Sequence, residues 1–239
     1  NKYSNQMGLQ VIVHEAASVS PDMDLSVLLP SGNIDLDQLT LELKTWMRRI
    51  QHPGLEKLVH TILSGDTLTR FLRNPAGTRL HHAYVGGLLH HTVSMTKLAA
   101  AMGSTIGDVD MDLIIAGALL HDVGKIREIS GEIGFPYTTE GRLMGHISIG
   151  AMAVDRAARK IPEISPELRQ KLLHILLSHH GDQEKGSPVP CATKEAFIVH
   201  YADESISPKR TPGQLGVRQN VTAVSVQSLT EIGTYGTVF

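Results

Sequence analysis

Histidines and aspartates recur on the apolar faces of consecutive predicted helices, and this feature constrains the fold more than any other. In the predicted helix over residues 79–102, apolar side chains recur every three or four residues, and His91 falls among them. The apolar residues of the next predicted helix, 108–121, lead directly to His121 and Asp122. Because an ionised carboxylate is costly to bury unless it is paired or binds a metal, these polar side chains are expected to meet in the core.

Three further predicted helices continue this pattern toward the C-terminus. They span about residues 141–160, 165–180 and 193–207. Their inward-facing polar residues are, in chain order, His146, then His179 and His180, then Asp203. A single inward histidine is usually a hydrogen-bonded core residue, but chance explains poorly a run of five helices that each direct His or Asp inward. Because these groups are imidazoles and carboxylates rather than Arg or Lys, the pattern favours a metal site over a salt-bridge network.

The remaining pattern predicts a mostly helical chain. Helical periodicity predicts additional helices at about residues 35–50, 53–64 and 66–72. Glycines and a proline separate short apolar pairs and predict a small hairpin within residues 126–139. Residues 8–13 predict one short strand, and the Ser-, Pro- and Asp-rich residues 18–34 predict a linker. The expected fold class is therefore all-α, a helical bundle with a short N-terminal β segment and a small hairpin.

These changes of pattern divide the chain into three expected parts. Residues 1–34 carry the β segment and the linker, and residues 35–207 form the helical domain. The helical periodicity weakens beyond this domain, so residues 208–239 are expected to be a C-terminal tail to which no structure is assigned.

Composition excludes several classes of protein. With 41% hydrophobic and 19% charged residues, the chain can bury a sizeable core. It has no apolar run of about 18 residues, so no membrane span is expected, and no secretory signal is visible, so the expected location is cytoplasmic. A formal net charge of -2 argues against a strongly basic nucleic-acid binder but leaves a local basic groove open. The single cysteine excludes a disulfide framework and a cysteine-based zinc finger.

Six sequence blocks occur in order along the chain. They are HHAYVGGLLHHTVSM (81–95), ALLHDVGK (118–125), GRLMGHISIG (141–150), LSHHG (177–181), GSPVP (186–190) and HYADESIS (200–207). Taken together they resemble the YhaM-like 3′→5′ exoribonucleases, a family of HD-domain metal-dependent phosphohydrolases. The resemblance covers about residues 53–207. In that family an OB-fold precedes the HD domain, which implies that residues 1–34 are the tail of an OB-fold and its linker.

The resemblance implies a site for two divalent metal ions. The first metal would be held by His91, His121, Asp122 and Asp203. The second would be held by His146 and His179, with His180 as a further candidate ligand, and Asp122 would bridge the two. Mixed imidazole and carboxylate ligands suit Mn, Fe or Zn better than Mg. The family makes Mn²⁺ the first choice.

Four residues are candidates for binding the substrate. Lys125 completes an HDxxK pattern and would meet the phosphate as charge builds up, which makes Lys125 and Asp122 the candidate catalytic residues. A plain helix-terminal role for this lysine carries about equal weight from spacing alone. Arg79, His81 and His82 precede the helix of His91 and are the other candidates for phosphate contacts.

The leading hypothesis is a metal-dependent phosphodiester hydrolase that removes mononucleotides from the 3′ end of single-stranded RNA or DNA. The alternative is an HD-type nucleotide phosphohydrolase, either a dNTPase or a cyclic-nucleotide phosphodiesterase. A third class, a non-catalytic metal-stabilised module, is disfavoured because the ligand set and Lys125 are complete. The expected partners are therefore single-stranded nucleic acid or nucleotides, with self-association into a homo-oligomer left open.

Overall fold

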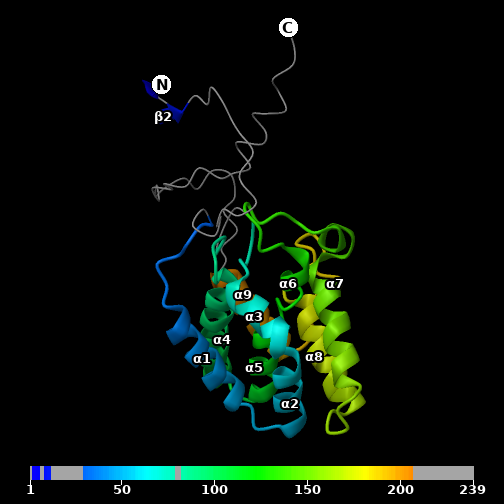
Figure 1. The fold of residues 1–239 in the computed structure, drawn as a ribbon. Helices are drawn as coiled ribbons and strands as arrows, with labels where there is room; N and C mark the ends of the chain where they lie inside the picture. Colours follow the sequence, from blue (N-terminus) through cyan, green and yellow to red (C-terminus); the bar gives the residue numbers. More distant parts are fainter. Residues whose placement is uncertain (1, 6–7, 12–28, 79–81, 207–239) are drawn as a thin grey trace.

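The protein is described from a computed structural model that covers residues 2–5, 8–11, 29–78 and 82–206, with side chains from residue 29 onward. It is mostly helical, which confirms the predicted all-α fold class (Figure 1). The helices are α1 (Leu36–Arg48), α2 (Pro53–Ile62), α3 (Gly65–Arg73), α4 (Gly87–Ile106), α5 (Met111–Leu120), α6 (Lys125–Glu128), α7 (Thr139–Ala158), α8 (Pro166–Ser178) and α9 (Lys194–Ile206).

The chain begins with a short antiparallel hairpin of β1 (Lys2–Asn5) and β2 (Gly8–Val11). The second strand agrees with the strand predicted near the N-terminus. The predicted C-terminal tail lies outside the described residues. Within the described part of the chain, no helix combines the length and the apolar composition that crossing a bilayer requires.

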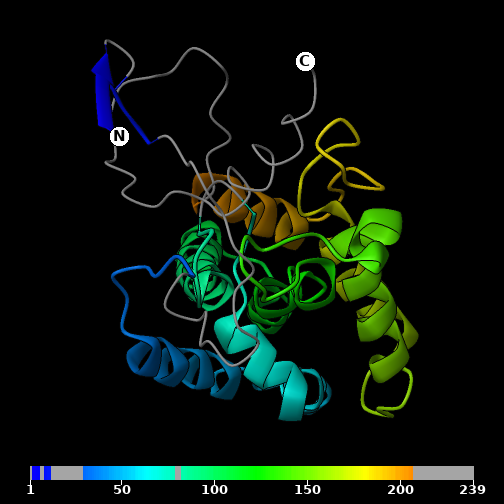
Figure 2. The same ribbon diagram turned by 45° about the horizontal axis from the view of Figure 1, so that its top comes forward.

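Helix α5 is the centre of the bundle. Its residues 113–120 are all buried, and it packs against α1, α2, α4, α8 and α9. Figures 1 and 2 place it between α4 and the α7–α8 pair. A helix that is apolar on every side has to be surrounded by others. The chain that leaves its C-terminus therefore emerges inside the domain, and the first two residues there are His121 and Asp122.

Helix α4 begins later than predicted. The prediction started this helix near residue 79 and placed two glycines in its interior, but Gly86 has a φ of +80° and the helix starts at Gly87. A left-handed residue cannot continue a right-handed helix, and glycine adopts that conformation without steric cost. A Cβ on Gly87 would also overlap the carbonyl oxygen of His82, so the loop before the helix folds closely onto its first turn.

The segment before α1 is attached to the loop before α4. The Val85 amide donates to the Pro30 carbonyl at 2.9 Å, and Ser31 forms a parallel bridge with Val85. Gly32 lies against the ring of Tyr84, because a Cβ there would be 2.6 Å from the nearest ring carbon. Part of the predicted linker is therefore packed against the helical domain.

The predicted hairpin over residues 126–139 is smaller than expected. Its first residues belong to the short helix α6, and one antiparallel bridge follows, between Ile129 and Tyr137. The Ser130 amide donates to the Pro136 carbonyl at 2.8 Å within this turn. Because the carbonyl of Lys125 accepts from the amide of Ile129, the helical turn uses residues that would otherwise lengthen the first strand.

Helix α7 is broken near its start. Gly145 has a φ of +68°, so the residues before it are not in register with the residues after it. An apolar stripe along one continuous helix over residues 141–160 would bury Leu143, but it is 79% exposed, and Met144 is 40% exposed. The periodicity argument fails there because it assumes one continuous helix across this glycine. Met152, further along α7, is 50% exposed.

Gly124→Ala is expected to destabilise the domain where α6 and α7 meet. A Cβ at residue 124 would overlap the backbone carbonyl of His146, and backbone cannot move aside as a flexible side chain can. Overpacking of this kind costs about 1–3 kcal/mol or more in the free energy of unfolding. Urea unfolding followed by circular dichroism measures the change.

Gly131→Ala is the matched control, because its new Cβ would have only the Asn74 Oδ1 nearby, at an ordinary 3.8 Å. Equal stability of the two variants would contradict the close approach at Gly124.

Candidate metal centre

Five segments of the bundle bring their histidines and aspartates to one place. Helix α4 supplies one histidine, the turn after α5 supplies a histidine and an aspartate, and α7 supplies another histidine. The end of α8 supplies two adjacent histidines, and α9 supplies an aspartate. These are all seven of the predicted ligands: His91, His121, Asp122, His146, His179, His180 and Asp203.

In the first cluster, formed by His91, His121, Asp122 and Asp203, the nitrogen and oxygen atoms are as far apart as the ligands of a single metal ion. The Nε2 atoms of His91 and His121 are 3.1 Å apart, and the His91 Nε2 is 3.2 Å from Oδ1 of Asp203. Asp122 Oδ2 lies 3.2 Å from the His121 Nε2 and 3.5 Å from the His91 Nε2. Atoms bound to one metal at about 2.0–2.2 Å are separated from each other by about 3.0–3.5 Å. The four atoms therefore fit one cation.

The second cluster faces the other oxygen of the same carboxylate. Asp122 Oδ1 is 3.5 Å from Nε2 of His146 and 3.8 Å from Nε2 of His179. His146, His179 and His180 each offer a ligand atom within 4.8 Å of the others. Asp122 thus stands between two groups of imidazoles, with one oxygen toward each, and this is the arrangement of a bridging carboxylate.

Three buried atoms of the second cluster lack a hydrogen-bond partner. They are Asp122 Oδ1 and the Nε2 atoms of His146 and His179. Buried polar atoms in folded proteins nearly always have a partner, so three such atoms facing one another need an explanation. A cation at this point would satisfy all three, and the donor set therefore fits a metal.

Backbone contacts orient three of the imidazoles. The Nδ1 atoms of His121, His179 and His180 lie 2.8, 2.7 and 3.1 Å from the carbonyl oxygens of Ala118, Leu176 and Lys185. A carbonyl can only accept, so Nδ1 of each neutral ring carries the proton and Nε2 keeps its lone pair. The main chain thus determines, before any metal binds, that Nε2 is the ring nitrogen with the free lone pair.

The electrostatics of the second cluster favour the forms that bind metal. Burial and neighbouring imidazoles lower the pKa of His179 well below its ordinary value, and burial with the adjacent His146 lowers the pKa of His180 to about 4. Burial raises the pKa of Asp122, but Lys125 and His121 outweigh it and hold the pKa well below the usual range. Neutral imidazole and ionised carboxylate are the species that coordinate cations.

Lys125 pairs with the carboxylate of Asp122. Its Nζ is 2.6 Å from Asp122 Oδ2, and its side chain is 16% exposed. Burial lowers the pKa of Lys125, but Asp122 and Asp203 more than compensate, so the amine stays protonated. The lysine is the first residue of α6 rather than part of α5. It lies at the boundary between the buried cluster and the solvent.

The other candidate substrate residues are only partly described. The ring of His82 meets the ring of His91 edge-on at 5.5 Å and that of His90 at 5.0 Å. His90, which precedes the candidate ligand His91, is held by the Tyr84 hydroxyl, 2.5 Å from its Nδ1. Arg79 and His81 lie outside the described residues.

Two buried residues beside the cluster were given no role by the sequence. His200 is 7% exposed, and its Nδ1 contacts the His179 carbonyl at 2.9 Å. Glu128 is 8% exposed and contacts both the amide and the ring of His146. Glu128 lies at the start of the predicted hairpin, where no periodicity indicates which side chains point inward.

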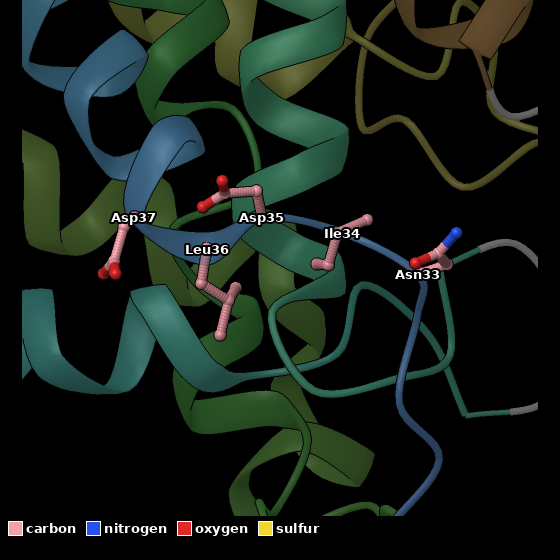
Figure 3. Close-up of a pocket in the computed structure, with 5 residues that line it drawn as sticks. All are labelled: Asn33, Ile34, Asp35, Leu36 and Asp37. Atoms are coloured by element: carbon pink, nitrogen blue, oxygen red, sulfur yellow. The ribbon is translucent and has the colours of Figure 1, made fainter.

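A hollow beside the start of α1 is unrelated to the cluster. Residues 33–37 line it, and none of them is among the seven predicted ligands (Figure 3). One of its two aspartates, Asp35, accepts the amide hydrogen of Gln38 at 2.9 Å and so caps the helix. The hollow is therefore explained by the local structure of the helix start.

Comparison with known protein families agrees with this geometry. Residues 88–205 match the family model of the HD domain. Over these residues the chain is similar to the HD domain. All seven residues of the cluster lie inside the matched range, and such a domain indicates a metal-dependent hydrolase of phosphoester bonds that uses divalent cations. No solved structure gave a significant match.

Asp122→Asn is expected to reduce the metal content of the purified protein. The amide keeps the volume of the carboxylate but loses its charge and one of its two oxygens, so it cannot bridge. The wild type is expected to hold two divalent ions per chain and the variant at most one, measured by elemental analysis after reconstitution and desalting.

Asp66→Asn is the control for this variant, because Asp66 lies exposed in the first turn of α3. If Asp122→Asn kept the wild-type metal content with an unchanged helical spectrum, the carboxylate would not be a bridge.

Proposed function

We propose that this protein is a metal-dependent 3′→5′ exonuclease that acts on single-stranded RNA, and also on DNA, releasing mononucleotides. The observation that carries the hydrolase part is the buried Asp122, whose two oxygens face two separate imidazole clusters at 3.2–3.8 Å. The exonuclease part rests on the six blocks that resemble the YhaM-like family.

Two metals would be held by the clusters on either side of Asp122. His91, His121 and Asp203 would complete the first site, and His146, His179 and His180 the second. When bound, such a pair lowers the pKa of water and stabilises both oxygens of an in-line displacement at phosphorus. Mixed nitrogen and oxygen ligands suit Mn, Fe or Zn. The resemblance to the YhaM-like family makes Mn²⁺ the first candidate, with Fe or Zn as alternatives.

The residues of the chain would contribute orientation and charge. The backbone carbonyls that hold the ring protons keep the imidazoles in place, so little reorganisation is needed during the reaction. The ammonium of Lys125, at the solvent side of the first cluster, would donate to a non-bridging phosphate oxygen. His82, edge-on to His91 and half-buried, would lie next to the same phosphate.

Binding of a nucleic-acid strand would depend on few cations. The formal net charge of -2 provides no general attraction for a polyanion. Affinity is therefore expected to be modest and to fall with salt according to the small number of phosphates contacted. An OB-fold preceding residue 34, as the resemblance implies, would add the aromatic stacking that single strands need.

The activity is tested with RNA labelled at its 5′ end and incubated with the metal-loaded protein. We expect a ladder that shortens progressively from the 3′ end and accumulates mononucleotides, and no products in the presence of a chelator or with Asp122→Asn. Internal cuts would make the protein an endonuclease. Hydrolysis of free deoxynucleoside triphosphates or cyclic nucleotides, with RNA left intact, would assign it to the small-nucleotide HD hydrolases instead.

Lys125→Met is expected to lower kcat while metal content stays near that of the wild type. Loss of one charged contact to the transition state costs on the order of 10²–10³ in rate. Single-turnover kinetics, together with elemental analysis of the same sample, separates the two effects.

Lys97→Met is the matched control, because Lys97 pairs with Glu42 on a solvent-exposed face. A Lys125→Met protein that lost its metals and its activity together would make Lys125 a structural counter-charge for Asp122.

A further inference from the structure

Glu128 makes two contacts with the candidate ligand His146. Its Oε1 accepts the His146 backbone amide at 2.9 Å and lies 3.1 Å from the ring Nδ1, while its Oε2 lies 3.0 Å from the same nitrogen. The carboxylate is nearly buried, at the end of α6. Both contacts come from one side chain, so the backbone and the ring of His146 are held together.

The break in α7 makes the first of these contacts available. In a continuous helix the amide of His146 would donate to the carbonyl of Arg142, four residues earlier. The positive φ of Gly145 ends that arrangement, and the amide of His146 donates to Glu128 instead. Glu128 therefore caps the second segment of α7, which is the segment that carries the imidazole.

The position of Glu128 is itself fixed by its neighbours. Its carbonyl accepts the amide of Thr138 at 2.9 Å, and its own amide donates to the carbonyl of Gly124 at 3.1 Å. Gly141 packs so closely that a Cβ there would overlap the Glu128 carbonyl. A carboxylate on such a constrained backbone can hold a partner in one orientation.

The second contact determines which ring nitrogen of His146 carries the proton. The same carboxylate accepts the backbone amide of His146, and a carboxylate oxygen offers the ring a lone pair rather than a proton. A neutral ring bonded to it must carry its proton on Nδ1. The lone pair is then on Nε2, the atom that faces Asp122 Oδ1 at 3.5 Å.

We propose that Glu128 is a positioning residue that selects the Nδ1–H tautomer of His146 and aims its Nε2 at the second metal. Among the candidate ligands, the other three imidazoles whose Nδ1 contacts are described use main-chain carbonyls, so His146 differs from them in relying on a side chain. The inference rests on the two-metal centre of the proposed function.

The tautomer is tested in metal-free protein with ¹⁵N-labelled histidine, at mildly alkaline pH, where free imidazole is neutral. The His146 signals are assigned by their loss in His146→Ala. We expect the wild type to show a protonated Nδ1 and Glu128→Ala to show a mixture rich in Nε2–H. Glu128→Gln, whose amide oxygen can still accept from Nδ1–H, is expected to keep the wild-type tautomer.

Metal titration followed by calorimetry gives the second readout. Glu128→Ala is expected to weaken the binding of one of the two ions by about 10–100-fold while the other changes little. Glu140→Ala is the control, because this neighbouring acid pairs with Arg127 and contacts none of the seven predicted ligands in the described residues. Glu128→Gln is expected to fall between these variants, since it keeps the acceptor and loses the charge.

Three outcomes would overturn the proposal. These are an unchanged tautomer in Glu128→Ala, an unchanged affinity for both metals, or an equal loss at both sites, which would indicate damage to the fold. Failure of the proposed function is distinguishable, because neither readout uses a substrate. A wild type that binds two metals and leaves RNA intact would refute the exonuclease but not the role of Glu128, whereas a wild type that binds fewer than two would refute the centre itself.

Discussion

The burial of one carboxylate organises this domain. Asp122 is 2% exposed and follows a helix that is apolar on every side. An ionised group in that position is tolerated only if cations or hydrogen-bond donors surround it. Lys125 supplies one such cation, and α4, α7 and the turn after α8 place imidazoles around the carboxylate that would hold metal cations. The same helices therefore pack the bundle and build the site around Asp122.

Glycines determine how closely the helices can approach this carboxylate. Gly124, two residues after Asp122, lies against the backbone of His146, and no larger residue fits there. Gly145 breaks α7 just before that histidine, so its amide is accepted by Glu128 rather than by the helix. Gly124 lets the backbones of residues 124 and 146 approach closely, and Gly145 leaves the His146 amide free to donate to Glu128. Neither contributes a ligand atom, yet both determine the geometry of the second cluster.

The histidines and aspartates of the site could be placed from the sequence wherever a helix was continuous. His91 and Asp203 each occupy one position of a regular apolar stripe, and His179 ends such a stripe, so period alone directed them inward. The same argument failed at Leu143, because a backbone with positive φ at Gly145 shifts the register, and residue identity does not reveal φ. It gave no role to Glu128, which lies outside any periodic segment. Periodicity predicts which face of a helix is buried, whereas the break at Gly145 and the position of Glu128 depend on contacts between elements.

The contact between residues 30–32 and the loop before α4 has a practical consequence for dividing the chain. A cut at residue 34, where the helical pattern begins, would remove the carbonyl of Pro30 that holds Val85. It would also expose the ring of Tyr84, whose hydroxyl holds His90 beside the candidate ligand His91. A shortened protein that starts at Asp35 would keep every helix and every ligand and still lose the support of one wall of its site. The independently working unit therefore extends upstream of its first helix, and it includes Pro30.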